Sequence, residues 1–89
     1  MKSSSVEKVL FALAYKSFGQ LIEKTRQLRP LIAPWLEQCH CVERGQDWFI
    51  FKFPDDQEFA RQCLVDDHID FLRAQLSEIT GHSVMIILK

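Results

Sequence analysis

The chain is poor in the residues that interrupt regular structure, with only three glycines and three prolines in 89 residues. This excludes long flexible linkers, and the length suits one domain. No apolar run reaches the roughly 18 residues needed to span a bilayer. The serines at positions 3–5 lead directly into an amphipathic pattern, without the apolar segment of a signal peptide. We therefore expect a cytoplasmic protein that does not bind membranes.

Cysteine is also scarce, and its count of three is odd, which does not suit a secreted scaffold held by disulfides. The net charge of −1 argues against strong nucleic-acid binding, because such proteins usually present a basic face. Residues 1–30 carry six basic and two acidic side chains, whereas residues 31–70 carry three basic and nine acidic ones. This asymmetry fits either a charged protein partner or two differently solvated faces.

Hydrophobic residues make up 47% of the chain, and their spacing predicts helices at its start. Ser4 and Glu7 form a capping box, which predicts that a helix begins there. That helix either continues to about residue 28 or breaks near Ser17, since Gly19 lowers helix propensity. Pro30 can open a second, short helix at residues 30–36.

Two strands follow, at residues 39–43 and 47–53, joined by a turn that contains Gly45. Side chains alternate along the second strand, with Phe49, Phe51 and Phe53 on one side and Trp48, Ile50 and Lys52 on the other. Three phenylalanines in register make their side the core face. Helical patterns capped by acidic residues at 55–56 and 66–67 come next, ending at a glycine at position 81 that needs positive φ. A last strand covers residues 84–88.

These elements predict an α+β fold, in which helices pack on one face of a small three-stranded sheet in the order α-α-β-β-α-β. Residues 1–17 would be a helical extension and residues 18–89 the domain. The expected core is aromatic and aliphatic, and comprises Leu21, Phe49, Phe51, Phe53, Leu72, Leu76 and Ile79.

The other side of the second strand is the candidate partner-binding surface. Trp48 and Ile50 would form an exposed apolar patch, because the helices cover the phenylalanine side. Lys52 on the same face and Arg44 at the turn would supply a basic rim. The N-terminal helix offers either a second contact surface, through residues such as Phe11 and Tyr15, or a lid that folds back over the patch.

Metal binding and catalysis are both disfavoured. Cys39, His40 and Cys41 lack the C-x₂₋₄-C spacing of zinc sites and would have to recruit Cys63 and His68 from a helix. Buried cysteines that act as small hydrophobic residues are the alternative. Cys63 and His68 as nucleophile and base lack a third orienting group. The aspartates at 66, 67 and 70 suit a helix start better than a magnesium site. We expect no enzyme activity, cofactor or metal.

Nucleotide-binding motifs are also missing. The sequence contains neither G-x-x-x-x-G-K-[ST] nor G-x-G-x-x-G, the loops that cradle phosphates. It also has no G-x-x-G between helices, the loop with which KH domains clamp nucleotides. These absences favour a protein-interaction module over the alternative, which is a KH-like nucleic-acid binder.

From Phe18 to the end, a linear pattern resembles a known family. Phe18 is followed by Leu21 and Ile22, then by P-W-L at 34–36, F-I-F-K-F at 49–53, L-S-E-I-T-G at 76–81 and an aliphatic strand. This pattern resembles the small KH-like domain near the C-terminus of the tau/gamma subunit of the bacterial DNA polymerase III clamp loader. The N-terminal domain of the bacterial replication initiator is also similar, on the basis of Trp35 and the E-F-A-R segment at 58–61.

Both resemblances imply a truncated KH-like fold and a non-catalytic module of bacterial replication. The tau-type resemblance implies the polymerase catalytic subunit or the replicative helicase as the partner. The initiator-type resemblance implies the helicase, regulators or further copies of the same chain, and hence a weak homo-oligomer. The clamp loader's ATPase region has no counterpart among these residues, so no ATPase activity is implied.

Overall fold

A computed structural model describes the backbone of residues 2–89 and the side chains of residues 14–65 and 68–89. Its helices are α1 (Lys2–Leu28), α2 (Ala33–Leu36), α3 (Glu58–Asp67) and α4 (Ile69–Thr80), with a 3₁₀ turn, η1 (Asp55–Gln57), before α3. Its strands are β1 (Cys41–Arg44), β2 (Trp48–Lys52) and β3 (Met85–Leu88). The α+β fold and the element order agree with the sequence-based prediction, with α3 and α4 forming the helical segment between β2 and β3.

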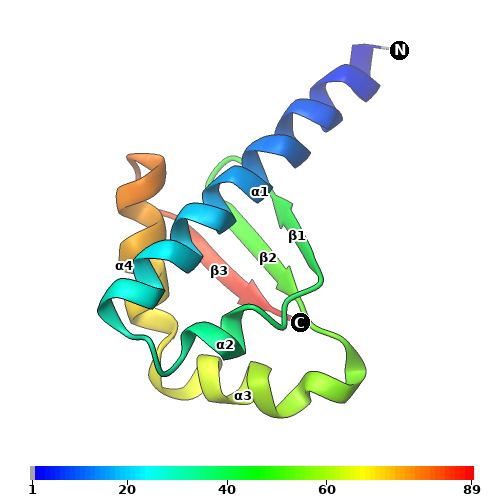
Figure 1. Ribbon diagram of the computed structural model, residues 1–89. Helices are drawn as coiled ribbons and strands as arrows, with labels where there is room; N and C mark the ends of the chain where they lie inside the picture. The colour runs from blue at the N-terminus through cyan, green and yellow to red at the C-terminus, as the bar shows by residue number, and fades with distance from the viewer. Residues whose placement is uncertain (1) are drawn as a thin grey trace.

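Helix α1 is continuous, so the break considered near Ser17 does not occur, and the helix begins at Lys2 rather than Ser4. Glycine in a helix interior costs roughly 0.5–1 kcal/mol, but Gly19 lies among residues that pack into the core. Ala14 and Leu21 are fully buried on this helix, and Phe18 is nearly so. Their burial favours a continuous helix despite the glycine. The N-terminal part of α1 extends beyond the sheet (Figure 1).

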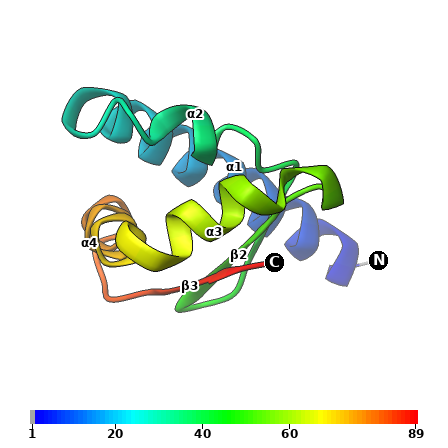
Figure 2. The same cartoon turned by 90° about the horizontal axis from the view of Figure 1, so that it is seen from below.

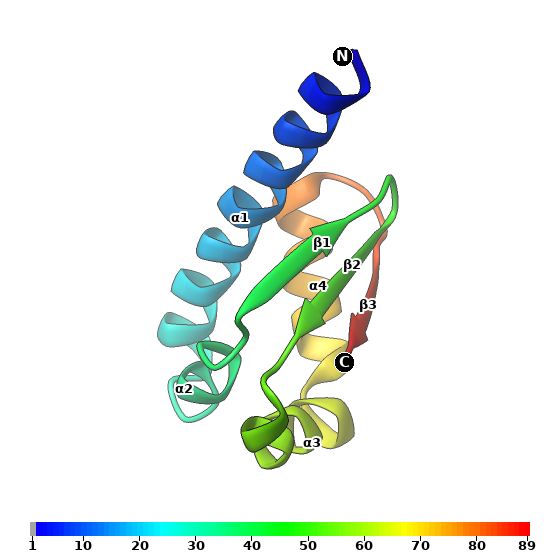
Figure 3. The ribbon, with the colours of Figure 1, turned by 90° about the vertical axis from the view of Figure 1, so that its right-hand side faces the viewer.

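The sheet has the order β1-β2-β3, with β1 antiparallel and β3 parallel to the central strand. All the helices lie to one side of it, as the view along the sheet shows (Figure 2). Helix α1 packs mainly over β1, and α4 packs beside α1 and over β3 (Figure 3). The sheet is therefore covered on one face only, as the phenylalanine alternation predicted.

The core lies between that covered face and the helices. Phe49 and Phe51 are fully buried, and Phe51 meets Phe18 of α1 edge to face, with ring centroids 5.0 Å apart. Of the seven predicted core residues, six are buried and Ile79 is partly buried against them. The strand faces were therefore assigned correctly from the sequence.

The predicted acidic caps of α3 and α4 were wrong. Gln57 precedes α3 and makes no side-chain cap, and α3 continues through residues 66–67 as far as Asp67. His68 is the junction residue, because its φ of −121° leaves the helical region. Arg29, just past the end of α1, donates to His68 Nδ1 over 2.9 Å and stacks on Phe71. These contacts hold the junction between α3 and α4. At the other end of α4, Gly81 ends the helix with the expected positive φ, 83°.

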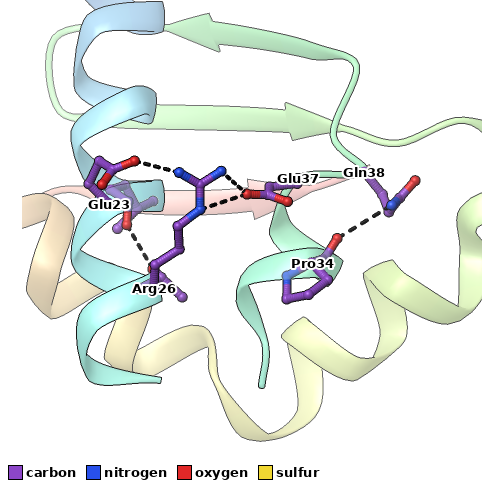
Figure 4. Close-up of polar contacts among 7 residues, drawn as sticks. Glu23, Arg26, Pro34, Glu37 and Gln38 are labelled. Carbon is purple, nitrogen blue, oxygen red and sulfur yellow. Dashed lines mark hydrogen bonds and ion pairs between the residues drawn. The ribbon is translucent and has the colours of Figure 1, made fainter. Parts of the chain in front are cut away.

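Short helix α2 is tied to α1 by a charged contact (Figure 4). The guanidinium of Arg26 on α1 donates to the Glu37 carboxylate, from Nε over 2.9 Å, and also to Glu23 one turn earlier. Both partners are substantially exposed, and exposed ion pairs contribute about 0–1 kcal/mol. The apolar contacts of α2, through Leu36 and Ala33, are therefore its main anchor.

Replacing Phe51 with Ala should lower the free energy of unfolding by about 3–5 kcal/mol, because it leaves a cavity between β2 and α1. Chemical denaturation measures this directly. Met85→Ala is the matched control on the opposite face of the sheet, where 54% of the side chain is exposed. Its loss should stay within about 1 kcal/mol. Equal losses for the two variants would contradict the assignment of the faces.

Candidate functional site

The uncovered face of the sheet carries a continuous group of apolar side chains. The register pairs Trp48 with Met85 and Ile50 with Ile87, and all four point away from the helices. The exposed fractions are 36% for Trp48, 54% for Met85 and 43% for Ile87. We call these four residues the open face. A contiguous group of exposed apolar side chains is a candidate interaction surface.

The indole of Trp48 lies against the hairpin turn at Gly45. A Cβ on Gly45 would fall within the volume of the Trp48 ring, closer than van der Waals contact allows. The N–H of Gly45 also donates to the carbonyl of Trp48 over 2.9 Å and closes the turn. Glycine at this position therefore leaves the space that the Trp48 ring occupies beside the turn.

The face becomes charged on the β1 side. Lys52 Nζ is 2.8 Å from Glu43 Oε1 across the two strands. The hydrogen bond and the charge of Glu43 raise the pKa of Lys52, so the ammonium is retained. The face is thus apolar over β3 and carries an ion pair over β1. A partner that covered it would meet an apolar area with a polar rim, the usual composition of an interface.

Three of the six predicted partner-binding residues lie together here, namely Trp48, Ile50 and Lys52. Arg44 does not, because β1 continues one residue further than predicted. Arg44 therefore takes the pleat position on the same side as Val42, and its guanidinium lies 5.1 Å from the Phe49 ring centre, on the helix side. The expected basic rim at the turn is thus wrong for this residue.

Tyr15 also lies on the helix side. Its hydroxyl accepts a hydrogen bond from the Val42 N–H over 3.3 Å, at the outer edge of β1. Phe11 falls outside the residues whose side chains are described. Because α1 continues as a single helix through residues 6–13, this segment does not turn back over the open face (Figure 1). The lid considered from the sequence is therefore not formed.

Met85 and Ile87 were missed by the sequence reading. Residues 84–88 are all apolar, so no alternation in the sequence separates the exposed Met85 and Ile87 from the buried Val84 and Ile86. What the sequence did not supply was the parallel pairing of β3 with β2. Without that register, nothing places Met85 beside Trp48.

A second apolar area lies at α2 and α3. Phe59 is 69% exposed, and its ring meets Trp35 edge to face at 5.3 Å. Leu31, 87% exposed, lies just before α2. These side chains come from helix surfaces and a turn, where single exposed apolar residues are common. The open face differs because strand pairing makes its four residues one contiguous surface.

The three cysteines and three histidines are the candidate metal ligands of the chain. In the described part of the chain, no three His, Cys, Asp or Glu side chains come together as a metal would require. Cys39 Sγ lies 3.2 Å from the Cys41 carbonyl, and burial raises the pKa of its thiol to about 11. A thiol that stays protonated at neutral pH is a poor nucleophile and metal ligand.

Within the described residues, no helix has both the length and the hydropathy that crossing a bilayer demands. No protein-family model, curated protein or solved structure matches the chain.

Cys39 should alkylate slowly, and its rate should rise about tenfold per pH unit between pH 8 and 10, because the thiolate fraction does so below a raised pKa. Iodoacetamide labelling followed by peptide mass spectrometry measures each cysteine separately. A Cys39 rate that levels off above pH 9, as an ordinary thiol of pKa about 8.5 would show, would contradict the burial assigned to it.

Proposed function

We propose that this chain is a non-catalytic protein-interaction module that binds its partner through the open face. The observation that carries the proposal is one contiguous apolar surface, in which Trp48, Met85 and Ile87 are exposed and Ile50 is partly buried, on a face that no described helix covers. Tryptophan is among the residue types most enriched at interface hot spots. The polar rim formed by Glu43 and Lys52 adds orientation more than affinity, as exposed charges do.

A protein partner fits this face better than nucleic acid does. Lys52, the lysine of β2 on this side of the sheet, is already paired with Glu43. This side of β2 therefore offers no row of unpaired basic groups to a phosphate backbone. The aromatic and basic residues also do not interleave as they do on a base-stacking platform. A titration with single- and double-stranded DNA should accordingly show no salt-dependent binding in the micromolar range.

We propose that the partner belongs to the bacterial replication machinery and is the polymerase catalytic subunit or the replicative helicase. This part rests on the resemblance of residues 18–89 to the tau/gamma KH-like domain; the initiator-type domain is the alternative. A cytoplasmic location belongs to the same proposal, and the three free cysteines are compatible with a reducing compartment.

One of these two proteins is expected to bind the native chain. Replacing Trp48 with Ala should weaken that binding by roughly 2 kcal/mol, which is about 30-fold in Kd. The thermal midpoint should change little, because the side chain is 36% exposed and leaves no enclosed cavity. Isothermal titration calorimetry and thermal unfolding measure the two quantities on the same samples.

Trp35→Ala provides the matched control, since it removes the other tryptophan, which is partly buried between α2 and α3. This variant should lose stability and keep its affinity. If Trp35→Ala weakens binding while Trp48→Ala leaves it unchanged, the partner binds the helical surface, and the open face is not the site.

A further inference from the structure

The outer edge of β3 presents unpaired backbone groups. Met85 N–H and Lys89 N–H donate inward to the carbonyls of Asp47 and Phe51, over 2.9 and 3.0 Å. Because successive residues of a strand point their N–H and C=O groups to opposite edges, Ile86 and Leu88 point theirs outward. In the described chain no strand lies beyond β3 to receive them. The sheet therefore ends in an available edge.

The other edge of the sheet is protected. At β1 the outward N–H of Val42 is taken by the Tyr15 hydroxyl, and α1 packs along that strand. Strand β3 is short, with four residues, but its sequence M-I-I-L includes neither the proline nor the charge that commonly protects an edge. Unprotected apolar edges pair readily with another extended chain. The contrast between the two edges makes β3 the place where a strand can add.

Helix α4 places a polar group above this edge. Ser77 Oγ accepts the outward N–H of Val84 over 3.2 Å, so the Ser77 side of α4 faces the free edge. Arg73 lies one turn earlier on the same side of the helix. Helix α4 and strand β3 are joined by a short turn and run in roughly opposite directions (Figures 1 and 3). One helical turn back from Ser77 is about 6 Å, the length of about two strand residues beyond Val84. Helical spacing therefore puts Arg73 near the level of Ile86.

The Arg73 side chain is 41% exposed, and its guanidinium is only partly satisfied. Its Nε is buried and has no hydrogen-bond partner among the described residues. Its Nη1 approaches Asp70 only at 3.6 Å, and that carboxylate is 91% exposed. Leaving a buried donor unpaired is costly, and an arginine in this state favours binding of a carboxylate.

We infer that the partner binds as an extended segment that adds a fourth strand to β3 and presents a carboxylate to Arg73. This inference rests on the proposed function and specifies how the partner binds. The added strand would pair with the outward groups of Ile86 and Leu88. Its alternate side chains would continue the open face beyond Met85 and Ile87, where apolar side chains fit best.

A second copy of this chain is the less suitable occupant. Residues 84–89 read V-M-I-I-L-K, so a β3 strand from a second copy would bring a lysine and no acidic side chain to the edge. Like charges brought together oppose association. The charge at Arg73 therefore selects an acidic segment of another protein.

The test selects peptides from a random twelve-residue phage library on the intact chain and synthesises the enriched sequences. We expect alternating apolar residues with one Asp or Glu, and chemical-shift changes at the amides of Ile86 and Leu88 in ¹⁵N-labelled protein. Arg73→Gln should raise the Kd of these peptides about tenfold, because a charge-assisted hydrogen bond is lost. Arg61→Gln, which removes an arginine paired with Glu58 on α3, is the matched control and should leave Kd unchanged. Replacing the acidic residue of the peptide by its amide should reproduce the Arg73→Gln loss.

Enriched peptides with helical i, i+3, i+4 spacing that move the amides of the open face, but not those of Ile86 and Leu88, would overturn strand addition and leave the proposed function standing. Concentration-dependent changes at Ile86 and Leu88 without any peptide would show that a second copy occupies the edge, and would overturn the inference. Failure of the proposed function is a separate result, since it appears as unchanged partner affinity in Trp48→Ala.

Discussion

Burial of the β2 phenylalanines against helices from one side is the constraint on which the rest of the molecule depends. Phe49 and Phe51 are fully buried, and burying a side chain of this size contributes roughly 1.5–3 kcal/mol. Because strand side chains alternate, fixing these two inward fixes Trp48 and Ile50 outward. Among the described residues, no helix lies over the second face (Figure 2). The open face is thus a consequence of how the core is built.

The same arrangement explains why the two edges of the sheet differ. Helix α1 crosses the sheet over β1, where Tyr15 reaches the edge N–H of Val42. Helix α4 covers β3, and its serine reaches only the first outward N–H, that of Val84. The apolar part of the open face and the unpaired edge consequently meet at β3. The proposed function and strand addition are therefore two properties of one strand.

Local patterns in the sequence predicted the elements well. The alternation in 48–53 gave the strand faces, and Gly81 gave the end of α4. Features set by distant parts of the chain were not predictable in this way. The side of the sheet on which Arg44 lies depended on one extra residue in β1. The junction at His68 depended on a contact with Arg29 from the end of α1. The position of Met85 beside Trp48 depended on the parallel register of β3. The candidate site was accordingly half predicted, through β2 and not through β3.

Amide hydrogen exchange along β3, read by NMR, distinguishes a free strand edge from a paired one. We expect an alternating pattern in the free protein, in which the amides of Met85, Ile87 and Lys89 exchange slowly because they donate to β2. The amides of Ile86 and Leu88 should exchange rapidly, because they face the open edge. Uniform protection along the strand would contradict the account, since it would mean that the edge of β3 is already paired.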